Sequence, residues 1–200
     1  MSGYNALVNA LLPMARAIDS INRTIGKYIA WFILAAVLVS AVNATVRKLL
    51  DMSSNSWLEL QWVLFSAVFL LCAPWTLLDN EHIRIDILNN LMPQWLRSTI
   101  DLVGHIFFLL PLAIIMIVTG TPFFLKSYAI NEQSMNAGGL PQWPAKSLIA
   151  IGFALLFIQA ISEIIKRIAI MRGLMDDPHA MKKSAAEEEV EHLVDAIEKR

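Results

Sequence analysis

The sequence contains a single cysteine, Cys72, and only 16% of its 200 residues are charged. One cysteine excludes an intrachain disulfide and a metal cage built from cysteines. So few charges, together with 56% hydrophobic residues, fall outside the range of soluble globular domains. The net charge of −1 does not by itself identify a partner, and we predict that none of the partners is a nucleic acid.

Hydrophobic residues gather into four long runs, at 28–46, 57–78, 102–125 and 147–165. About 20 helical residues cross the roughly 30 Å hydrocarbon core of a bilayer, so each run is long enough to do so. The sequence therefore predicts an all-α membrane protein with a four-helix transmembrane domain over 28–170. Residues 1–27 form an amphipathic cytoplasmic or interfacial lead, and 171–200 form a charged cytoplasmic tail. Although Val42-Asn43-Ala44 imitates a signal cleavage site, the first run is too long for a signal peptide, so we expect the lead to be kept.

The distribution of basic residues predicts the orientation of these spans. With four spans, the lead, the loop between the second and third runs, and the tail share one side of the membrane. That side carries twelve Lys and Arg residues and the other side four, which are Arg47, Lys48, Lys126 and Lys146. Because Lys and Arg are retained on the cytoplasmic side during insertion, we predict that both termini are cytoplasmic. The six tryptophans agree, since each falls near an end of a predicted span.

Both polar ends of the chain show helical periodicity. In the lead, apolar residues recur every three or four positions, which predicts an amphipathic helix that lies on the cytoplasmic leaflet or packs on the bundle. They are Leu7, Leu11, Met14, Ile18, Ile21 and Ile25. In the tail, Val190, Leu193, Val194 and Ile197 form a narrow stripe on a strongly acidic segment. Two interpretations of this segment remain: a solvated helix, and a helix that docks onto a partner.

The stretch "EHIRID" at 81–86 interrupts the apolar runs. On a helical wheel, its isoleucines join later apolar residues in one arc while His82 and Asp86 fall on the other, and Arg84 alone intrudes on the apolar arc. This pattern predicts a short helix from Glu81 to Leu91 in the interface plane, with Arg84 reaching toward lipid phosphates. His82 and Asp86, with the neighbouring Glu81, are a poor set of metal ligands. We therefore predict no metal site.

After Pro93 the pattern stays helical to about Leu125, some 33 residues, which is roughly 50 Å of helix. This exceeds the thickness of a bilayer, so we expect the helix to tilt or project beyond the membrane. Pro111 is expected to kink it.

Ionisable residues inside the spans are candidate functional sites. Glu59 lies near the start of the second run, where we expect it to contact polar groups of another helix. Glu163 lies near the end of the fourth run, one turn from Lys166 and Arg167, which can pair with it. His105 is the only histidine within a run, so a bis-histidine haem lacks its second ligand. The residues form no proton relay or broken-helix carrier site, and we predict a carrier's companion with no cofactor and no enzymatic activity.

Three stretches carry a resemblance to a known family: "NATVRKLL", "NSWLELQWVLFSAVFLLCAPWTLLDNEHIRIDIL" and "GGLPQWPAKSLIAIGFALLFIQAISEIIKR". Over about residues 28–170, the chain resembles the small membrane subunit of tripartite ATP-independent periplasmic (TRAP) transporters. The loop "NAGGLPQWPAK" looks like the subgroup labelled mannitol or chloroaromatic-compound transporters. Residues that fall on the family pattern are Asn43, Arg47, Trp57, Glu59, His82, Arg84 and Asp86. Many members have two adjacent acids where this chain has Leu58-Glu59.

The resemblance implies a role in the bacterial inner membrane beside two partners. One is a large permease subunit that carries the substrate and sodium sites and moves as an elevator, and the other is a periplasmic binding protein that delivers an organic acid or similar small solute. The small subunit would brace the large one and would bind no substrate itself.

Two contact regions follow from this picture. Arg84 and Arg97 are our candidates for binding the headgroups of membrane phospholipids. For contact with the binding protein we expect the loop at 131–144, through Gly139, Leu140, Pro141, Trp143 and Pro144. The alternatives from other classes are a four-helix membrane anchor of cytochrome type and a small exporter acting as a homodimer.

Overall fold

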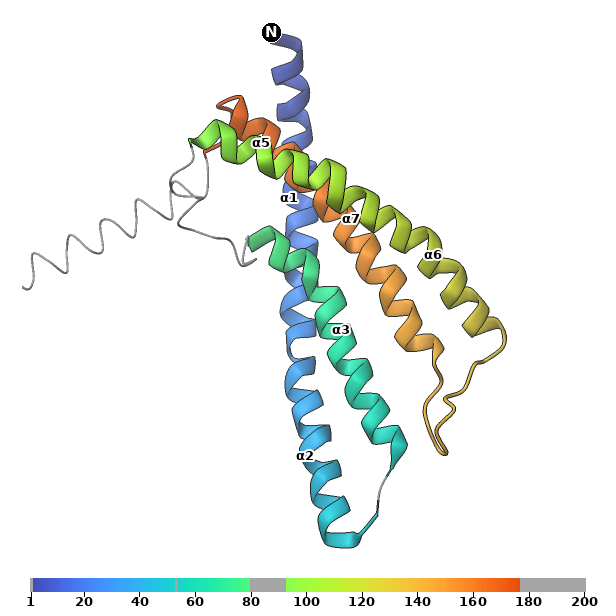
Figure 1. Cartoon of the computed structure of the whole chain (residues 1–200). Coiled ribbons are helices and arrows are strands. Elements are labelled where there is room, and N and C mark those ends of the chain that lie inside the picture. Colours follow the sequence, from blue (N-terminus) through green and yellow to red (C-terminus); the bar gives the residue numbers. More distant parts are fainter. Residues whose placement is uncertain (1, 53, 80–92, 177–200) are drawn as a thin grey trace, which may run out of the picture.

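The computed structural model describes residues 2–52, 54–79 and 93–176, and Figure 1 shows their arrangement. These residues are helical apart from short connections and one isolated β-bridge between Gln133 and Pro141. The helices are α1 (Ser2–Ala30), α2 (Phe32–Leu50), α3 (Asn55–Asp79), α5 (Gln94–Gly104), the π-helical turn η1 (His105–Leu109), α6 (Leu110–Ala129) and α7 (Trp143–Met171). The predicted interfacial helix at 81–91 and the acidic part of the tail lie outside the described residues.

Four stretches of this structure are long and apolar enough to cross a membrane. They are Ala6–Leu50, Asn55–Asp79, Trp95–Ala129 and Trp143–Met171, so the predicted all-helical class and the four apolar helices are confirmed. Helix α1, which contains the predicted lead, continues along the axis of α2 (Figure 1). The two helices meet at Trp31, whose N–H donates to the Tyr28 carbonyl at 3.3 Å.

The chain runs along the long axis of the molecule four times. α1 and α2 run down together, α3 returns, α5 to α6 runs down again and α7 returns (Figure 1). The start of α1 and the end of α7 therefore lie at the same end, which we call the terminal end. The opposite end, with the α2–α3 connection and the loop at 130–142, is called the loop end.

The third crossing contains a π-helical turn where a kink at Pro111 was predicted. Proline has no N–H to donate, and its ring clashes with the carbonyl four residues earlier. The chain responds with the turn His105–Leu109, in which the N–H of Leu110 donates to the carbonyl of His105, five residues back. Pro111 then occupies the first turn of α6, where the missing donor is tolerated.

Helix α7 lies at the centre, because α1, α3, α5 and α6 all pack against it. Small residues permit this close approach, as they do between helices in membranes. A methyl group added at Gly152 would lie 2.9 Å from the carbonyl oxygen of Leu70, so α7 and α3 are nearly in backbone contact there. The buried residues of α7 include Ala160, Ser162 and Ala169.

The face of α1 that packs on the bundle overlaps the predicted apolar stripe only in part. Val8, Leu12 and Ala15 pack with Ile165 and Ala169 of α7. The stripe residues Leu7, Met14 and Ile21 are exposed by 58, 46 and 56%, whereas Leu11, Ile18 and Ile25 are half-buried. Leu11 of the stripe packs against this contact, so the packed face is rotated relative to the stripe and shares one edge with it.

Candidate functional site

At the loop end, Glu59 of α3 is the centre of a polar junction with the loop at 130–142. Its carboxylate accepts hydrogen bonds from the Ser134 hydroxyl, from the Asn136 side-chain amide at 2.8 Å and from the Leu140 backbone N–H at 2.6 Å. Glu59 is only 5% exposed. One carboxylate thus accepts from three donors that are spread over seven loop residues. These bonds hold the whole loop in one shape.

The first turn of α3 completes this junction from the same side. Asn55 donates its side-chain amide to the Ala137 carbonyl at 3.0 Å, and the Ser56 hydroxyl donates to the Gly138 carbonyl. Gly138 has φ of +71°, a conformation that glycine adopts without a steric penalty. At Gly139, a methyl group would lie 2.7 Å from a Glu59 oxygen, so glycine is required for the carboxylate to approach.

The base of the loop is closed by an ion pair and by aromatic contacts. Lys146 at the start of α7 pairs with Glu132 and lies 4.1 Å from the centre of the Phe123 ring. Trp143 packs edge-on against Tyr128, with 5.4 Å between ring centres. The hydrogen bond from Lys146, together with its charge and that of Lys126, lowers the pKa of Glu132 below its ordinary value of 4.5. Glu132 therefore stays ionised at neutral pH and keeps the base of the loop closed.

The tip of the loop is its most exposed part. Met135 is fully exposed, and Asn136, Ala137 and Gly138 are exposed beside it. By contrast, the predicted contact residues Gly139, Leu140, Pro141, Trp143 and Pro144 are all half-buried. An exposed tip on a rigid base is suited to recognition by shape.

At the terminal end, a second polar junction joins α1 to α7. Gln159 is fully buried, and it accepts a hydrogen bond from Asn22 at 2.7 Å and donates to Asp19 at 2.8 Å and to Glu163 at 3.0 Å. Lys166 donates to Asp19 at 2.9 Å and to Glu163 at 2.5 Å. Two carboxylates therefore share one ammonium group in a part of the helix contact that is largely closed to solvent.

Further contacts extend this junction to the neighbouring helices. The Ser162 hydroxyl lies 2.8 Å from Asp19 and 3.2 Å from the Ala15 carbonyl, so it ties α7 to the backbone of α1. Arg167 pairs with Asp101 of α5 at 3.1 Å, and Arg23 pairs with Asp79 at the end of α3 at 3.1 Å.

The sequence suggested that both Lys166 and Arg167 could pair with Glu163, and the structure separates their roles. Lys166 does pair with Glu163. Arg167 points to α5 instead, because a residue one position further along a helix is rotated by about 100°. Glu59 also differs from expectation, since its partners lie on a loop and not on another helix.

Two of the residues on the family pattern meet at a small cavity of about 190 Å³. Asn43 of α2 and Trp57 of α3 both line it, along with Val42, Val46, Met52 and Ser54. Arg47 is exposed one turn further along α2, and Arg97 of α5 is half-buried. His82, Arg84 and Asp86 lie outside the described residues.

Sequence reasoning missed most members of both junctions. Asp19 and Asn22 belong to a polar stretch with Ser20, Arg23 and Thr24, in which no single residue stands out. Ser134 and Asn136 lie in a loop without periodicity. A spacing signal did exist, since Gln159, Glu163 and Lys166 recur every three or four residues on one face of α7. Among the described residues, no three His, Cys, Asp or Glu side chains are placed to hold a metal.

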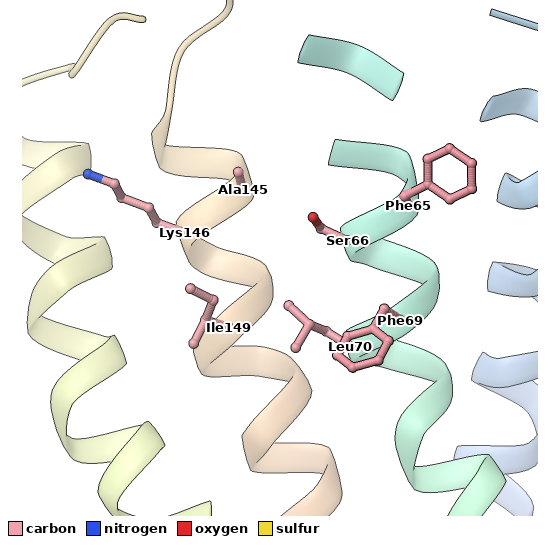
Figure 2. Close-up of a pocket in the computed structure, with 7 residues that line it drawn as sticks. All are labelled: Phe65, Ser66, Phe69, Leu70, Ala145, Lys146 and Ile149. Carbon is pink, nitrogen blue, oxygen red and sulfur yellow. The ribbon is translucent and has the colours of Figure 1, made fainter. Parts of the chain in front are cut away.

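An apolar groove lies between α3 and α7 in the half of the bundle nearer the loop end. Its volume is about 490 Å³, and it is lined by Phe65, Ser66, Phe69, Leu70, Ala145, Lys146 and Ile149. Figure 2 shows the Lys146 amine directed away from the groove, toward α6. The lining that remains suits hydrocarbon and offers no charge to bind an ionic solute.

Comparison with known proteins gives one match. Residues 27–169 fit the family model described as "Tripartite ATP-independent periplasmic transporters, DctQ component". No curated protein and no solved structure matches the chain significantly. The match begins near the end of α1 and covers α2, α3, α5, α6 and all but the last two residues of α7. It names a transporter component, not an enzyme. The chain therefore belongs to the DctQ family, the small membrane subunits of TRAP transporters.

Proposed function

We propose that this chain is the static scaffold subunit of a TRAP transporter. It braces a large elevator-type permease during sodium-coupled uptake of an organic acid or a similar small solute. Within the family, we place it in the subgroup labelled mannitol or chloroaromatic-compound transporters, on the likeness of its loop "NAGGLPQWPAK". The family match supports a TRAP component over a cytochrome-type anchor. The observation that carries the scaffold role is the pair of junctions, because the buried polar groups found there are used to fix helix to helix and loop to helix.

A static role predicts that locking the junction at the terminal end leaves transport intact. Ala15 and Ser162 are in contact there, since the Ser162 hydroxyl donates to the Ala15 carbonyl. In a Cys72→Ser background, Ala15→Cys and Ser162→Cys are introduced together and oxidised. Proteoliposomes with the large subunit and the binding protein are expected to take up solute at the same rate before and after oxidation. A large loss on oxidation, absent from each single-cysteine control, would show that α1 and α7 move.

We further propose that the loop end faces the periplasm and that both termini are cytoplasmic in the bacterial inner membrane. The charge asymmetry supports this orientation. Met135→Cys, at the exposed loop tip, should react with an impermeant maleimide in intact cells, whereas Arg16→Cys on α1 should react only after the membrane is opened. Reaction at position 16 in intact cells would reverse the orientation.

The loop at 130–142 is our proposed contact for the periplasmic binding protein. A photo-reactive residue at Met135 should form an adduct with the solute-loaded binding protein. A photo-reactive residue at Trp143, which is also a predicted contact but is half-buried against Tyr128, should form the same adduct in lower yield. Adducts with lipid alone from Met135 would contradict this assignment.

A further inference from the structure

Three exposed cations form a stripe along α1. Arg16, Arg23 and Lys27 are separated by seven and then by four residues, so on a helix they fall within about 40° of one another. The stripe is about 16 Å long, since each residue advances the helix by 1.5 Å. Within the described residues, only Arg23 of the three has an ion pair, with Asp79 at 3.1 Å, and both side chains of that pair are partly exposed. We call Arg16, Arg23 and Lys27 the basic stripe.

The basic stripe runs out of the membrane and not along its surface, because α1 continues the axis of α2 (Figure 1). From Lys27 to Leu50 these helices cover about 35 Å, which already exceeds the roughly 30 Å hydrocarbon core. Lys27 therefore lies outside the hydrocarbon, and Arg16 lies about 16 Å further out. The headgroup layer is only about 5 to 8 Å thick on each side, so lipid headgroups reach one end of the stripe. A partner that covers the whole stripe has to lie along α1.

The described chain ends beside this helix. After α7, Leu174 and Met175 pack against the apolar contact between α1 and α7, which begins at Val8. Residues 177–200 follow, and the first 10 of them precede a strongly acidic segment. Eleven extended residues reach up to about 36 Å, whereas Val8 and Lys27 are about 28 Å apart along α1. The acidic segment can therefore reach any part of the basic stripe.

The sequence of this segment carries the complementary pattern. Between 184 and 198 it has acidic residues at six positions and no Lys or Arg. Three of the acids, Glu187, Glu191 and Glu198, are separated by four and then by seven residues, which is the spacing of the basic stripe in reverse order. On a helix, which the apolar periodicity of the segment predicts, these three would also fall within about 40° of one another.

We propose that residues 187–198 of this chain's own tail bind antiparallel along the basic stripe of α1. In that register each cation meets one carboxylate. The pairs are Glu198 with Arg16, Glu191 with Arg23, and Glu187 with Lys27. Exposed ion pairs are individually weak, but three of them act together here on a tethered segment, whose effective concentration is about millimolar. The contact lies within one chain, so it does not depend on the proposed transport role.

The test measures the rate of disulfide formation in the complete chain, in a Cys72→Ser background and a neutral detergent. Ser20 is exposed on the side of α1 that carries the stripe, and in the proposed register it faces Val194. Ile21 is exposed beside it, but its side chain points about 100° away. Ser20→Cys with Val194→Cys should therefore form a disulfide about fivefold faster, or more, than Ile21→Cys with Val194→Cys. In about 1 M NaCl, where the Debye length is about 3 Å, the two rates should converge.

Charge reversal tests the register. In the Ser20→Cys, Val194→Cys chain, Arg16→Glu should slow disulfide formation about threefold, and adding Glu198→Arg should restore the rate. Lys27→Glu should slow it to a similar extent, but Glu198→Arg should not restore that rate, because Lys27 pairs with Glu187. Thermal unfolding of each variant checks that it is folded.

Three results would overturn the proposal. The first is an equal rate for the Ser20 and Ile21 pairs at low salt, and the second is rescue by Glu198→Arg of both reversed cations alike. The third is a disulfide-linked dimer on a non-reducing gel, which would place the tail on a second copy. The reaction is then repeated in liposomes of phosphatidylcholine, with and without phosphatidylglycerol. The same preference for Ser20 in both supports the tail as the occupant, whereas its loss with the anionic lipid alone would overturn the proposal in favour of lipid headgroups.

Discussion

At the terminal end, charged groups hold one helix to another, whereas at the loop end one carboxylate holds a loop through neutral donors. Asp19 and Glu163 share the Lys166 ammonium group inside a helix contact. Glu59 accepts hydrogen bonds from three neutral donors, which are the Ser134 hydroxyl, the Asn136 amide and the Leu140 N–H. The first arrangement makes the fold of the bundle depend on a charge balance. The second arrangement does not join the helices of the bundle; it determines the shape of the loop at 130–142.

In both arrangements, polar groups lose contact with water when they are buried. At the terminal end an ion pair compensates for that loss, and at the loop end neutral hydrogen-bond donors do. Breaking one member of a buried charged network leaves another charge without compensation. Breaking a carboxylate–donor set at a loop leaves groups that water can reach once the loop opens. We therefore expect global effects from the terminal end and local effects from the loop end, and the predictions that follow are ordered by expected size.

Lys166→Met should cause the largest loss of stability. It leaves the carboxylates of Asp19 and Glu163 together without their shared cation, and breaking a buried pair in this way costs about 3 to 5 kcal/mol. The free energy of unfolding in detergent measures the effect. Lys27→Met is the matched control. Because Lys27 is exposed on α1, this change should leave the free energy of unfolding nearly unchanged. Adding Asp19→Asn and Glu163→Gln to Lys166→Met should restore part of the loss; no recovery would argue against charge balance as the cause.

Gly26→Ala should come next, at about 1 to 3 kcal/mol, which is typical of overpacking. The added methyl group would lie 2.5 Å from a carbon of the Trp75 ring, so α1 and α3 must separate or the ring must move. Gly104→Ala is the control, because nothing lies within 4 Å of its added methyl group. Inside a helix that change should stabilise by about 0.5 to 1 kcal/mol. Equal melting temperatures for the two variants would show that the contact at Gly26 is not tight.

The sequence predicted the four apolar helices because 20-residue apolar runs leave few other structures in a membrane protein. It also predicted a kink at Pro111 from local covalent chemistry, and the structure has a π-helical turn just before that residue. It did not predict which face of α1 is packed. Leu7 and Met14 belong to the apolar pattern and are exposed, whereas Val8, Leu12 and Ala15 pack on α7. That is a property of two helices together, which no single-helix wheel contains.

The candidate site was predictable to a similar degree. Glu59 stood out because a carboxylate within an apolar run needs partners, but its partners lie 75 to 81 residues away along the chain. Their identity depends on the loop folding back onto α3, which has no periodic signal in sequence. The junction at the terminal end has the same character, since Asn22 and Gln159 are 137 residues apart.

Glu59→Gln should release the loop without unfolding the bundle. An amide offers only one acceptor oxygen, so its NH₂ group must face at least one of the donors that now converge on the carboxylate. Hydrogen exchange at the Leu140 N–H, which donates to Glu59, and at the Ser134 N–H, which donates to the Leu140 carbonyl, should become several-fold faster. Glu132→Gln at the base of the same loop is the comparison variant and should speed exchange less. A fall in melting temperature as large as that of Lys166→Met would contradict the separation of local and global roles.

The smallest effect should be the pH response of the base of the loop. The hydrogen bond from Lys146 lowers the pKa of Glu132 in the folded protein below 4.5. A group with a depressed folded pKa stabilises the fold above its unfolded pKa, and this contribution is lost as the pH falls through the folded pKa. The difference in unfolding free energy between the natural chain and Glu132→Gln should thus be constant near neutral pH and shrink to zero below 4.5. The carboxyl carbon chemical shift of Glu132 gives the folded pKa directly, and Lys146→Met should return that pKa toward 4.5. A folded pKa at or above 4.5 in the natural chain would show that the ion pair does not hold the loop closed, and would leave Glu59 as its main attachment.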